Sequence, residues 1–272
     1  MGLFSVNKDL CNGDGICAAE CPIKIIQMKE NLPQPVHNAE AMCINCGHCV
    51  AVCPKAALSL KTLSPEQCLP VNKEWMLSPE QAEHFLRSRR SIRNYKNKAV
   101  DKTILEQLIQ VASFAPSGHN AQPVRWQVIY EREEVKRLSG MVIDWMGYML
   151  KEHTGIAKKM HFDLVTAGWT FGMDTVSRGA PHLILANGDK NDLSTPSACT
   201  IAMTYLELAA QPLGLGSCWN GFFNAAAISW PPLQKALGLE QNQGNFGAMM
   251  VGYPVYKYHR MPLRNAPQIK WS

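Results

Sequence analysis

The chain is organised around the stretch Cys43-Ile44-Asn45-Cys46-Gly47-His48-Cys49-Val50-Ala51-Val52-Cys53-Pro54. Its first three cysteines are each separated by two residues, and a three-residue gap precedes the fourth, which is followed by proline. Soft iron prefers thiolate ligands, and short turns let three sulfurs point into one pocket. A zinc site of the Cys-x2-Cys type is the alternative, but it closes with four ligands and does not require this regular run. The stretch therefore predicts an iron-sulfur cluster.

This spacing also predicts a second copy of the motif, because its fourth thiolate binds a different cluster from the first three. The second copy is Cys11-Asn12-Gly13-Asp14-Gly15-Ile16-Cys17-Ala18-Ala19-Glu20-Cys21-Pro22, in which Asp14 takes the place of the second cysteine. The two copies form an internal repeat. We expect two 4Fe-4S clusters with crossed ligands, one held by Cys21, Cys43, Cys46 and Cys49 and the other by Cys11, Asp14, Cys17 and Cys53.

Asp14 has two interpretations. As an iron ligand, a carboxylate is harder and more labile than a thiolate, so its cluster would lose one iron readily and become 3Fe-4S. Alternatively, Asn12-Gly13-Asp14-Gly15 is a turn in which the glycines supply positive φ and Asp14 bonds to its own backbone. The sequence leaves both interpretations open.

About the first sixty residues resemble the bacterial two-cluster ferredoxins, which carry electrons one at a time. The pattern between the two motifs predicts a short hairpin over residues 25–36, and residues 57–60 read as a further strand. Residues 62–79 contain three prolines, scattered polar residues and the lone Cys68, which is typical of a connector. We therefore expect a ferredoxin-type domain at 1–61, a linker at 62–78 and a larger domain at 79–272.

Composition restricts the class of protein further. The 272 residues are 46% apolar and 18% charged, which suits a globular chain with a sizeable core. Seven of the ten cysteines lie at cluster spacings in the first 53 residues, which predicts a reducing, cytoplasmic location. No leader segment and no run of eighteen apolar residues is present, so we expect no membrane association. The net charge of +5 is not gathered into a basic tract, so nucleic acid is not an expected partner.

The larger domain is expected to mix helices and strands. Ser78 and Pro79 begin a predicted helix at about 79–90, and Asp101 caps a second one whose apolar residues repeat every three or four positions. Residues 151–179 are expected to be irregular. The other predicted elements are strands at 124–130, 180–187 and 246–253 and helices at 133–150 and 197–210.

Three motifs in this region resemble those of the nitroreductase family of flavin enzymes. They are Arg89-Arg90-Ser91-Ile92-Arg93, then Pro116-Ser117-Gly118-His119-Asn120-Ala121-Gln122-Pro123, and then Gly214-Leu215-Gly216-Ser217-Cys218-Trp219. The likeness continues to near the C-terminus. It implies an α+β protein with a three-layer α/β domain next to the small ferredoxin-like domain. It also implies bound FMN and a homodimer in which each FMN lies between two chains.

The chemistry of FMN agrees with these residues. Arg89 and Arg90 could bind the phosphate in a bidentate manner, and the amide of Asn120 could match the pyrimidine edge of the ring. Arg93 could stabilise the anionic reduced flavin. Tyr258 stands where some relatives of the family place a lysine. The FMN contacts that the resemblance implies are Arg89, Arg90, Ser91, Arg93, Pro116, Ser117, Asn120, Trp219, Asn220, Gly221 and Arg260.

These cofactors together predict the function. Clusters accept single electrons and FMN stores two, so we expect an FMN-dependent oxidoreductase that receives electrons through its clusters and reduces a nitroaromatic, quinone or activated alkene. No catalytic side chain is predicted, because the chemistry belongs to the flavin. The electron donor could be an external ferredoxin or NAD(P)H. Two alternatives are a flavoprotein that oxidises NAD(P)H and passes electrons out through the clusters, and a non-catalytic iron-sulfur redox sensor.

Overall fold

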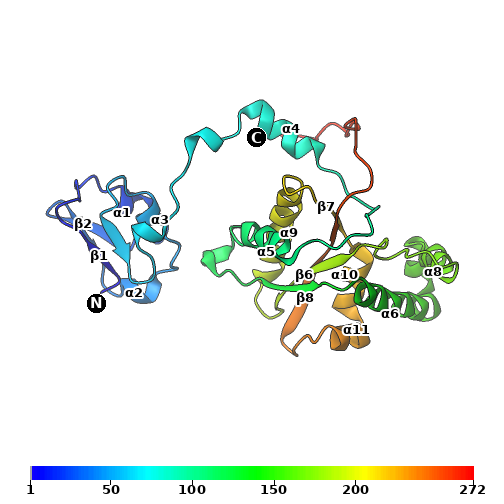
Figure 1. Cartoon of the computed structure of the whole chain (residues 1–272). Helices are drawn as coiled ribbons and strands as arrows, with labels where there is room; N and C mark the ends of the chain where they lie inside the picture. Colours follow the sequence, from blue (N-terminus) through cyan, green and yellow to red (C-terminus); the bar gives the residue numbers. More distant parts are fainter. Residues whose placement is uncertain (1) are drawn as a thin grey trace. The chain divides into compact units, whose positions relative to one another are not determined.

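The computed structural model describes residues 2–272 and divides them into two compact units (Figure 1). The smaller unit contains the residues up to Leu77 together with His119–Ala121, and the larger contains Ser78–Gly118 and Gln122–Ser272. Each unit has its own hydrophobic core. Within residues 2–272, no helix combines the length and the apolar character that crossing a membrane requires.

The smaller unit consists of two antiparallel strand pairs and three short helices. Strand β1 (Phe4–Val6) pairs with β4 (Leu58–Leu60), which joins the start of the cysteine-rich segment to its end. Strands β2 (Ile26–Lys29) and β3 (Leu32–Pro35) form the hairpin that the sequence predicts between the motifs. The helices are α1 (Ile16–Glu20), α2 (Ala39–Met42) and α3 (His48–Ala51).

The two copies of the cysteine motif fold in the same way. Gly15 precedes α1 and Gly47 precedes α3, and both adopt left-handed backbone angles, with φ of 71° and 73°. Glycine suits these positions because it has no Cβ, and a Cβ at residue 47 would lie 2.8 Å from the Leu63 side chain. In both copies the turn leads directly into a buried cysteine, Cys17 or Cys49.

After two short 3-10 turns at Pro65–Gln67 and Lys73–Trp75, the larger unit begins with α4 (Pro79–Ser88). Ser78 and Gln81 form the expected capping box at its start. The centre of this unit is one antiparallel sheet in the order β5-β6-β8-β7 (Figure 1). The residues Leu183–Ala186 at the centre of β6 are fully buried. The strands are β5 (Arg125–Ile129), β6 (His182–Asp189), β7 (Gly216–Trp219) and β8 (Gln243–Gly252).

Helices cover both faces of this sheet, which gives the predicted three-layer α/β architecture. One core cluster joins the sheet to α5 (Lys102–Ala112) and α9 (Thr195–Ala210). A second cluster joins the opposite face to the remaining helices. These helices are α6 (Arg132–Glu152), α7 (Thr154–Lys159), α8 (Phe162–Thr170), α10 (Gly221–Ser229) and α11 (Pro231–Ala236).

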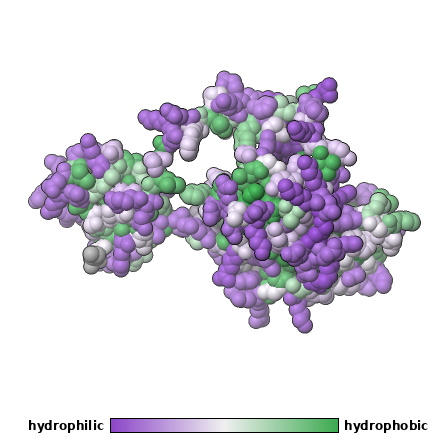
Figure 2. All heavy atoms as spheres, in the orientation of Figure 1, coloured by the Kyte–Doolittle hydropathy of each residue, from purple (hydrophilic) through white to green (hydrophobic). Residues whose placement is uncertain are grey.

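The prediction of an irregular segment at 151–179 is wrong over much of its length, because α7 and α8 lie within it. Ala157 and Phe162 are buried against α6, so tertiary packing stabilises these short helices. Neither helix has a side-chain cap at its start, and His161 before α8 has a left-handed φ of 56°. The usual sequence signals for helix ends are therefore missing. Apolar side chains remain exposed over α7 and α8 (Figure 2), including Ile156 and Leu164.

Candidate cofactor sites

The cysteines of the smaller unit form two groups, and each group draws on both copies of the motif. The first group surrounds Cys49. The pKa of the Cys49 thiol is raised to about 11, first by burial and then by the neighbouring thiols of Cys46, Cys43 and Cys21, while the Val50 amide acts in the opposite direction. Three of these cysteines come from the later copy and Cys21 comes from the earlier one. This is the crossed arrangement that the spacing predicts for one cluster.

The second group surrounds Cys17. Burial raises the pKa of the Cys17 thiol, the amide of the next residue lowers it, and the nearby thiols of Cys53 and Cys11 raise it. Asp14 lines the same small cavity as these three cysteines. One of its carboxylate oxygens, Oδ1, accepts a hydrogen bond from the Ile16 amide at 3.1 Å, as the turn interpretation expects. Asp14 therefore combines a turn contact with a position beside the three thiols.

Backbone amides contact two of the grouped sulfurs. The amides of Asn45 and Ala57 donate hydrogen bonds to Cys43 Sγ and Cys53 Sγ at 3.4 and 3.3 Å, a type of contact that tunes iron-sulfur clusters. The preference for iron-sulfur clusters over zinc rests on the regular cysteine run in the sequence.

In the larger unit, Arg89 and Arg90 line a pocket between the end of α4, α9, β7 and the segment after β8; we call it the arginine pocket. The guanidinium carbon of Arg90 lies 5.8 Å from the centre of the Tyr258 ring. Lys257 also lines the pocket. Some family members have a lysine at the position of Tyr258; in this chain the lysine lies one residue earlier, at Lys257. With three cationic side chains, the pocket fits an anion such as a phosphate.

Arg89 already has a partner within the fold. Its guanidinium contacts the Glu207 carboxylate at 2.9 Å, and only 9% of the Glu207 side chain is exposed. Sequence reasoning missed Glu207, although one signal was available: it is the only charged residue in the apolar helix α9. A lone acid in such a helix is rarely buried without a cation beside it. The pair holds Arg89 in place at the wall of the pocket.

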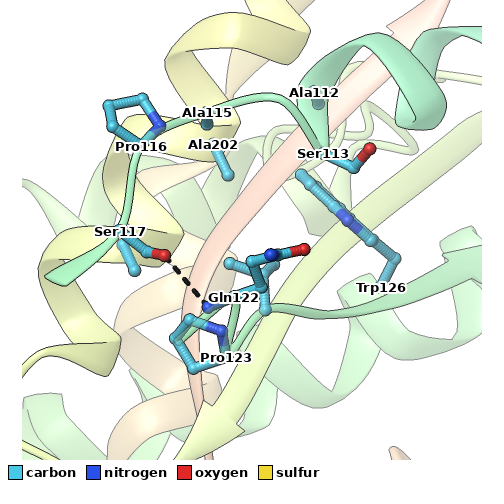
Figure 3. Close-up of a pocket in the computed structure, with 11 residues that line it drawn as sticks. Ala112, Ser113, Ala115, Pro116, Ser117, Gln122, Pro123, Trp126 and Ala202 are labelled. Atoms are coloured by element: carbon cyan, nitrogen blue, oxygen red, sulfur yellow. Dashed lines mark hydrogen bonds between the residues drawn. The ribbon is translucent and has the colours of Figure 1, made fainter. Parts of the chain in front are cut away.

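Pro116 and Ser117 line a different pocket, formed by the end of α5, the loop before β5, and α9 (Figure 3). The Ser117 hydroxyl accepts a hydrogen bond from the Gln122 amide at 2.9 Å, which closes the loop on itself. Trp126 forms part of the wall. This loop pocket shares no lining residue with the arginine pocket. The predicted flavin residues are therefore divided between two pockets of the larger unit.

The segment Trp219–Gly221 connects β7 to α10. The side chain of Asn220 is buried and caps α10 by accepting from the Phe223 amide at 3.2 Å. The backbone N–H of Asn220 donates to the Ala248 carbonyl at 2.8 Å. Because Asn220 is used in this way within the fold, its role is to fix the path of its two neighbours.

Four other predicted residues lie outside both pocket linings. Ser91 accepts a bond from Arg89 Nη1 at 3.4 Å, and exposed Arg93 donates to the Ser91 carbonyl at 3.4 Å. Asn120 has a left-handed φ of 54° and belongs by its contacts to the smaller unit. Arg260 is exposed in the segment that follows β8. The structure thus groups Arg89 with Arg90 and Pro116 with Ser117, without bringing all predicted residues together.

Comparison with known proteins agrees with the fold and these sites. Residues 86–253 match the model of the nitroreductase family, and residues 4–54 match that of the 4Fe-4S dicluster domain. The chain therefore belongs to the nitroreductase family and carries an N-terminal dicluster domain. The predicted class, an oxidoreductase of the nitroreductase type with a ferredoxin-type 4Fe-4S domain, is confirmed.

Individual relatives share the larger part of the chain. A protein of Archaeoglobus fulgidus, provisionally named NADH dehydrogenase/NAD(P)H nitroreductase, is 25% identical over 64% of this chain and 86% of its own length. An iodotyrosine deiodinase of Thermotoga neapolitana is 31% identical over 48% of this chain and 68% of its own. A nitroreductase of Bacteroides fragilis, solved with bound FMN, has a TM-score of 0.59 at 19% identity, covering 71% of this chain and 98% of that one.

Proposed function

We propose that this protein is an FMN-dependent oxidoreductase in which electrons enter through two 4Fe-4S clusters and leave by reducing a small organic acceptor, such as a nitroaromatic, quinone or activated alkene. The observation that carries the proposal is the presence, in one chain of the nitroreductase family, of two crossed thiol groups and an arginine-lined pocket. When bound, the clusters supply one-electron chemistry and FMN supplies two-electron chemistry.

We assign the two halves of the repeat to the clusters by the crossed groups. Cys21, Cys43, Cys46 and Cys49 would hold one cluster, and Cys11, Cys17 and Cys53, with Asp14 beside them, would hold the other. A carboxylate in that position favours a cluster that exchanges or loses one iron. We keep the proposed division of the chain into a cluster domain at 1–61, a linker at 62–78 and a flavin domain at 79–272.

The arginine pocket suits the phosphate end of FMN. Arg90 and Lys257 add positive charge to its wall, and Glu207 orients Arg89. The Trp219–Gly221 segment would lie along the reactive edge of the ring, with Asn220 holding it in position. Protons for the acceptor would come from water or from the flavin.

The same residues support a homodimer. Ala198 and Ala202 of α9 line the loop pocket, whereas Glu207 and Gln211 line the arginine pocket. At about 100° per residue, these pairs are about 140° or more apart around the helix axis. One flavin that touches Arg89 and Pro116 of the same chain would have to pass around α9. A second copy can supply its own loop instead, so that each FMN lies between two chains.

A second function uses the same cofactors in the opposite direction. The provisional name of the Archaeoglobus fulgidus relative includes NADH and NAD(P)H as electron donors. If this chain shares that donor, FMN would be reduced first and the clusters would pass electrons to an external carrier.

Anaerobic stopped-flow spectroscopy of the reconstituted full-length protein separates these functions. The protein is mixed in turn with reduced ferredoxin and NADH, and absorbance is recorded for the clusters and for the flavin. Reduced ferredoxin should bleach the clusters before the flavin, and the flavin should reoxidise when a nitroaromatic or quinone is added. Immediate flavin bleaching by NADH, followed by cluster reduction, would favour the second function. A protein that retains clusters but binds no FMN would refute both.

A further inference from the structure

The loop between α8 and β6 contains an arginine in an unfavourable backbone conformation. Arg178 has a φ of 57°, a left-handed value that long side chains rarely adopt. Its side chain is exposed and takes no part in the ion pairs formed within residues 2–272. No packing or pairing role within the fold therefore accounts for an arginine at this position.

A neighbouring carboxylate holds the loop in this conformation. The Oδ1 atom of Asp174 accepts hydrogen bonds from the amides of Val176 and Ser177 at 3.1 and 2.8 Å, and its Oδ2 atom accepts one from Gly179 at 2.9 Å. Both chain neighbours of Arg178 are thus fastened to Asp174. Left-handed residues held by their surroundings cluster at ligand sites, which makes a binding role for Arg178 the relevant hypothesis.

The loop is also joined to the segment that we place beside the flavin. The buried Ser177 hydroxyl accepts a bond from Asn220 Nδ2 at 3.1 Å and lies 2.7 Å from the Ser139 hydroxyl. Arg178 follows Ser177 directly. Burial raises the pKa of the Cys218 thiol in β7, and the charges of Arg93 and Arg178 act to lower it.

The other charged side chains of this region have partners within the fold. Glu207 is paired with Arg89 at 2.9 Å, and Arg93 donates to the Ser91 carbonyl at 3.4 Å. We propose that Arg178 binds a carboxylate on the organic acceptor, so that the preferred acceptors are aromatic or unsaturated carboxylates. A guanidinium matches a carboxylate with two parallel hydrogen bonds. This inference rests on the proposed function, because it needs the flavin beside Trp219–Gly221.

The test compares an acid with its neutral ester in the flavin half-reaction. Full-length protein with FMN is reduced anaerobically with stoichiometric dithionite and mixed with 4-nitrobenzoate or methyl 4-nitrobenzoate, while flavin reoxidation is followed. Each reaction passes two electrons and two protons to the nitro group, which gives a nitroso group and water. The variants are Arg178→Asn, which tolerates positive φ, and Arg178→Lys, which keeps the charge. Lys235→Gln, an exposed charge change on α11, is the control.

The wild-type protein should react faster with the acid than with the ester. Arg178→Asn should slow the reaction with the acid at least about tenfold and leave the ester nearly unchanged, because a charge-assisted contact is lost. Arg178→Lys should retain part of the preference, and Lys235→Gln all of it. Equal slowing of acid and ester, or no preference in the wild type, would overturn the inference. Absence of FMN, or no reoxidation by either acceptor, would instead refute the proposed function on which it rests.

Discussion

His182 makes the stability of the larger unit depend on pH. The imidazole is 1% exposed; its Nε2 accepts a bond from the Val100 amide at 2.8 Å, and its Nδ1 lies 2.6 Å from the Tyr130 carbonyl. Burial lowers the pKa of His182 below 6.5; the Tyr130 carbonyl raises it, the charge of Arg132 lowers it and that of Glu131 raises it. A proton on Nε2 would remove the acceptor for Val100, so the fold requires the neutral ring.

The sign of the effect follows from this lowered pKa. Above pH 6.5 the imidazole is neutral in both states, so its contribution to stability is complete. As the pH falls below 6.5 the unfolded chain binds the proton first, and stability is lost by up to about 1.4 kcal/mol per pH unit. Near pH 5 the loss should reach at most about 2 kcal/mol. This agrees with the roughly 1–3 kcal/mol expected for leaving a buried amide without its acceptor.

The matched variant is His182→Phe, which keeps a ring of similar size but cannot accept from Val100. It should lower the free energy of unfolding by about 1–3 kcal/mol near pH 7.5, and the difference from wild type should shrink as the pH falls toward 5. Urea unfolding of the full chain, followed by tryptophan fluorescence, measures both values, because every tryptophan except Trp75 lies in the larger unit. Parallel pH profiles for the two proteins would show that His182 does not carry the effect.

Three further predictions concern the cofactor sites. In Gly216→Ala, the new Cβ would lie 2.7–2.8 Å from three atoms of Ile92, so the variant should be about 1–3 kcal/mol less stable. It should also bind FMN more weakly in fluorescence titration, and an unchanged FMN affinity would contradict this prediction. Glu207→Gln removes a negative charge next to Arg89. The affinity for FMN relative to riboflavin, which lacks the phosphate, should therefore rise about fivefold. A fall in this ratio would count against a phosphate in the arginine pocket. Electron paramagnetic resonance should detect a 3Fe-4S signal in air-exposed wild-type protein. In Asp14→Cys a fourth thiolate replaces the carboxylate, so this signal should disappear. The same signal in both proteins would show that Asp14 is not a cluster ligand.

Much of the fold could be predicted from local patterns in the sequence. The cysteine repeat, the Ser78 capping box and the Asp101 cap are short-range signals, and the structure contains the elements that they predict. The helices at α7 and α8 escaped prediction because tertiary burial, rather than caps, stabilises them. The buried uncharged strand residues were predictable, and successive residues of β6 and β8 alternate between the two core clusters because side chains alternate between the faces of a sheet; which helices cover each face depends on tertiary packing.

The candidate sites show the same limit. Residue types pointed to cationic groups for a phosphate, but the pairing of Arg89 with Glu207 joins residues 118 positions apart. The contribution of Arg178 depends on a backbone angle, and no turn signal in the sequence marks that angle at an arginine. Likewise, the structural use of Asn220 follows from its contact with the distant Ser177. Contacts between remote segments decide these roles, and single-sequence patterns do not record them.

The crossing of the thiol groups has a consequence for biosynthesis. Cys21 belongs with three cysteines that follow it by more than twenty residues, and Cys53 belongs with Cys11 and Cys17. Neither half of the repeat can therefore complete a cluster while the ribosome is still making the other half. Iron and sulfide would have to be delivered after residue 53 has left the exit tunnel, when the chain downstream is already being translated. The earliest moment at which either cluster could be completed therefore falls while the flavin-binding portion is still being made.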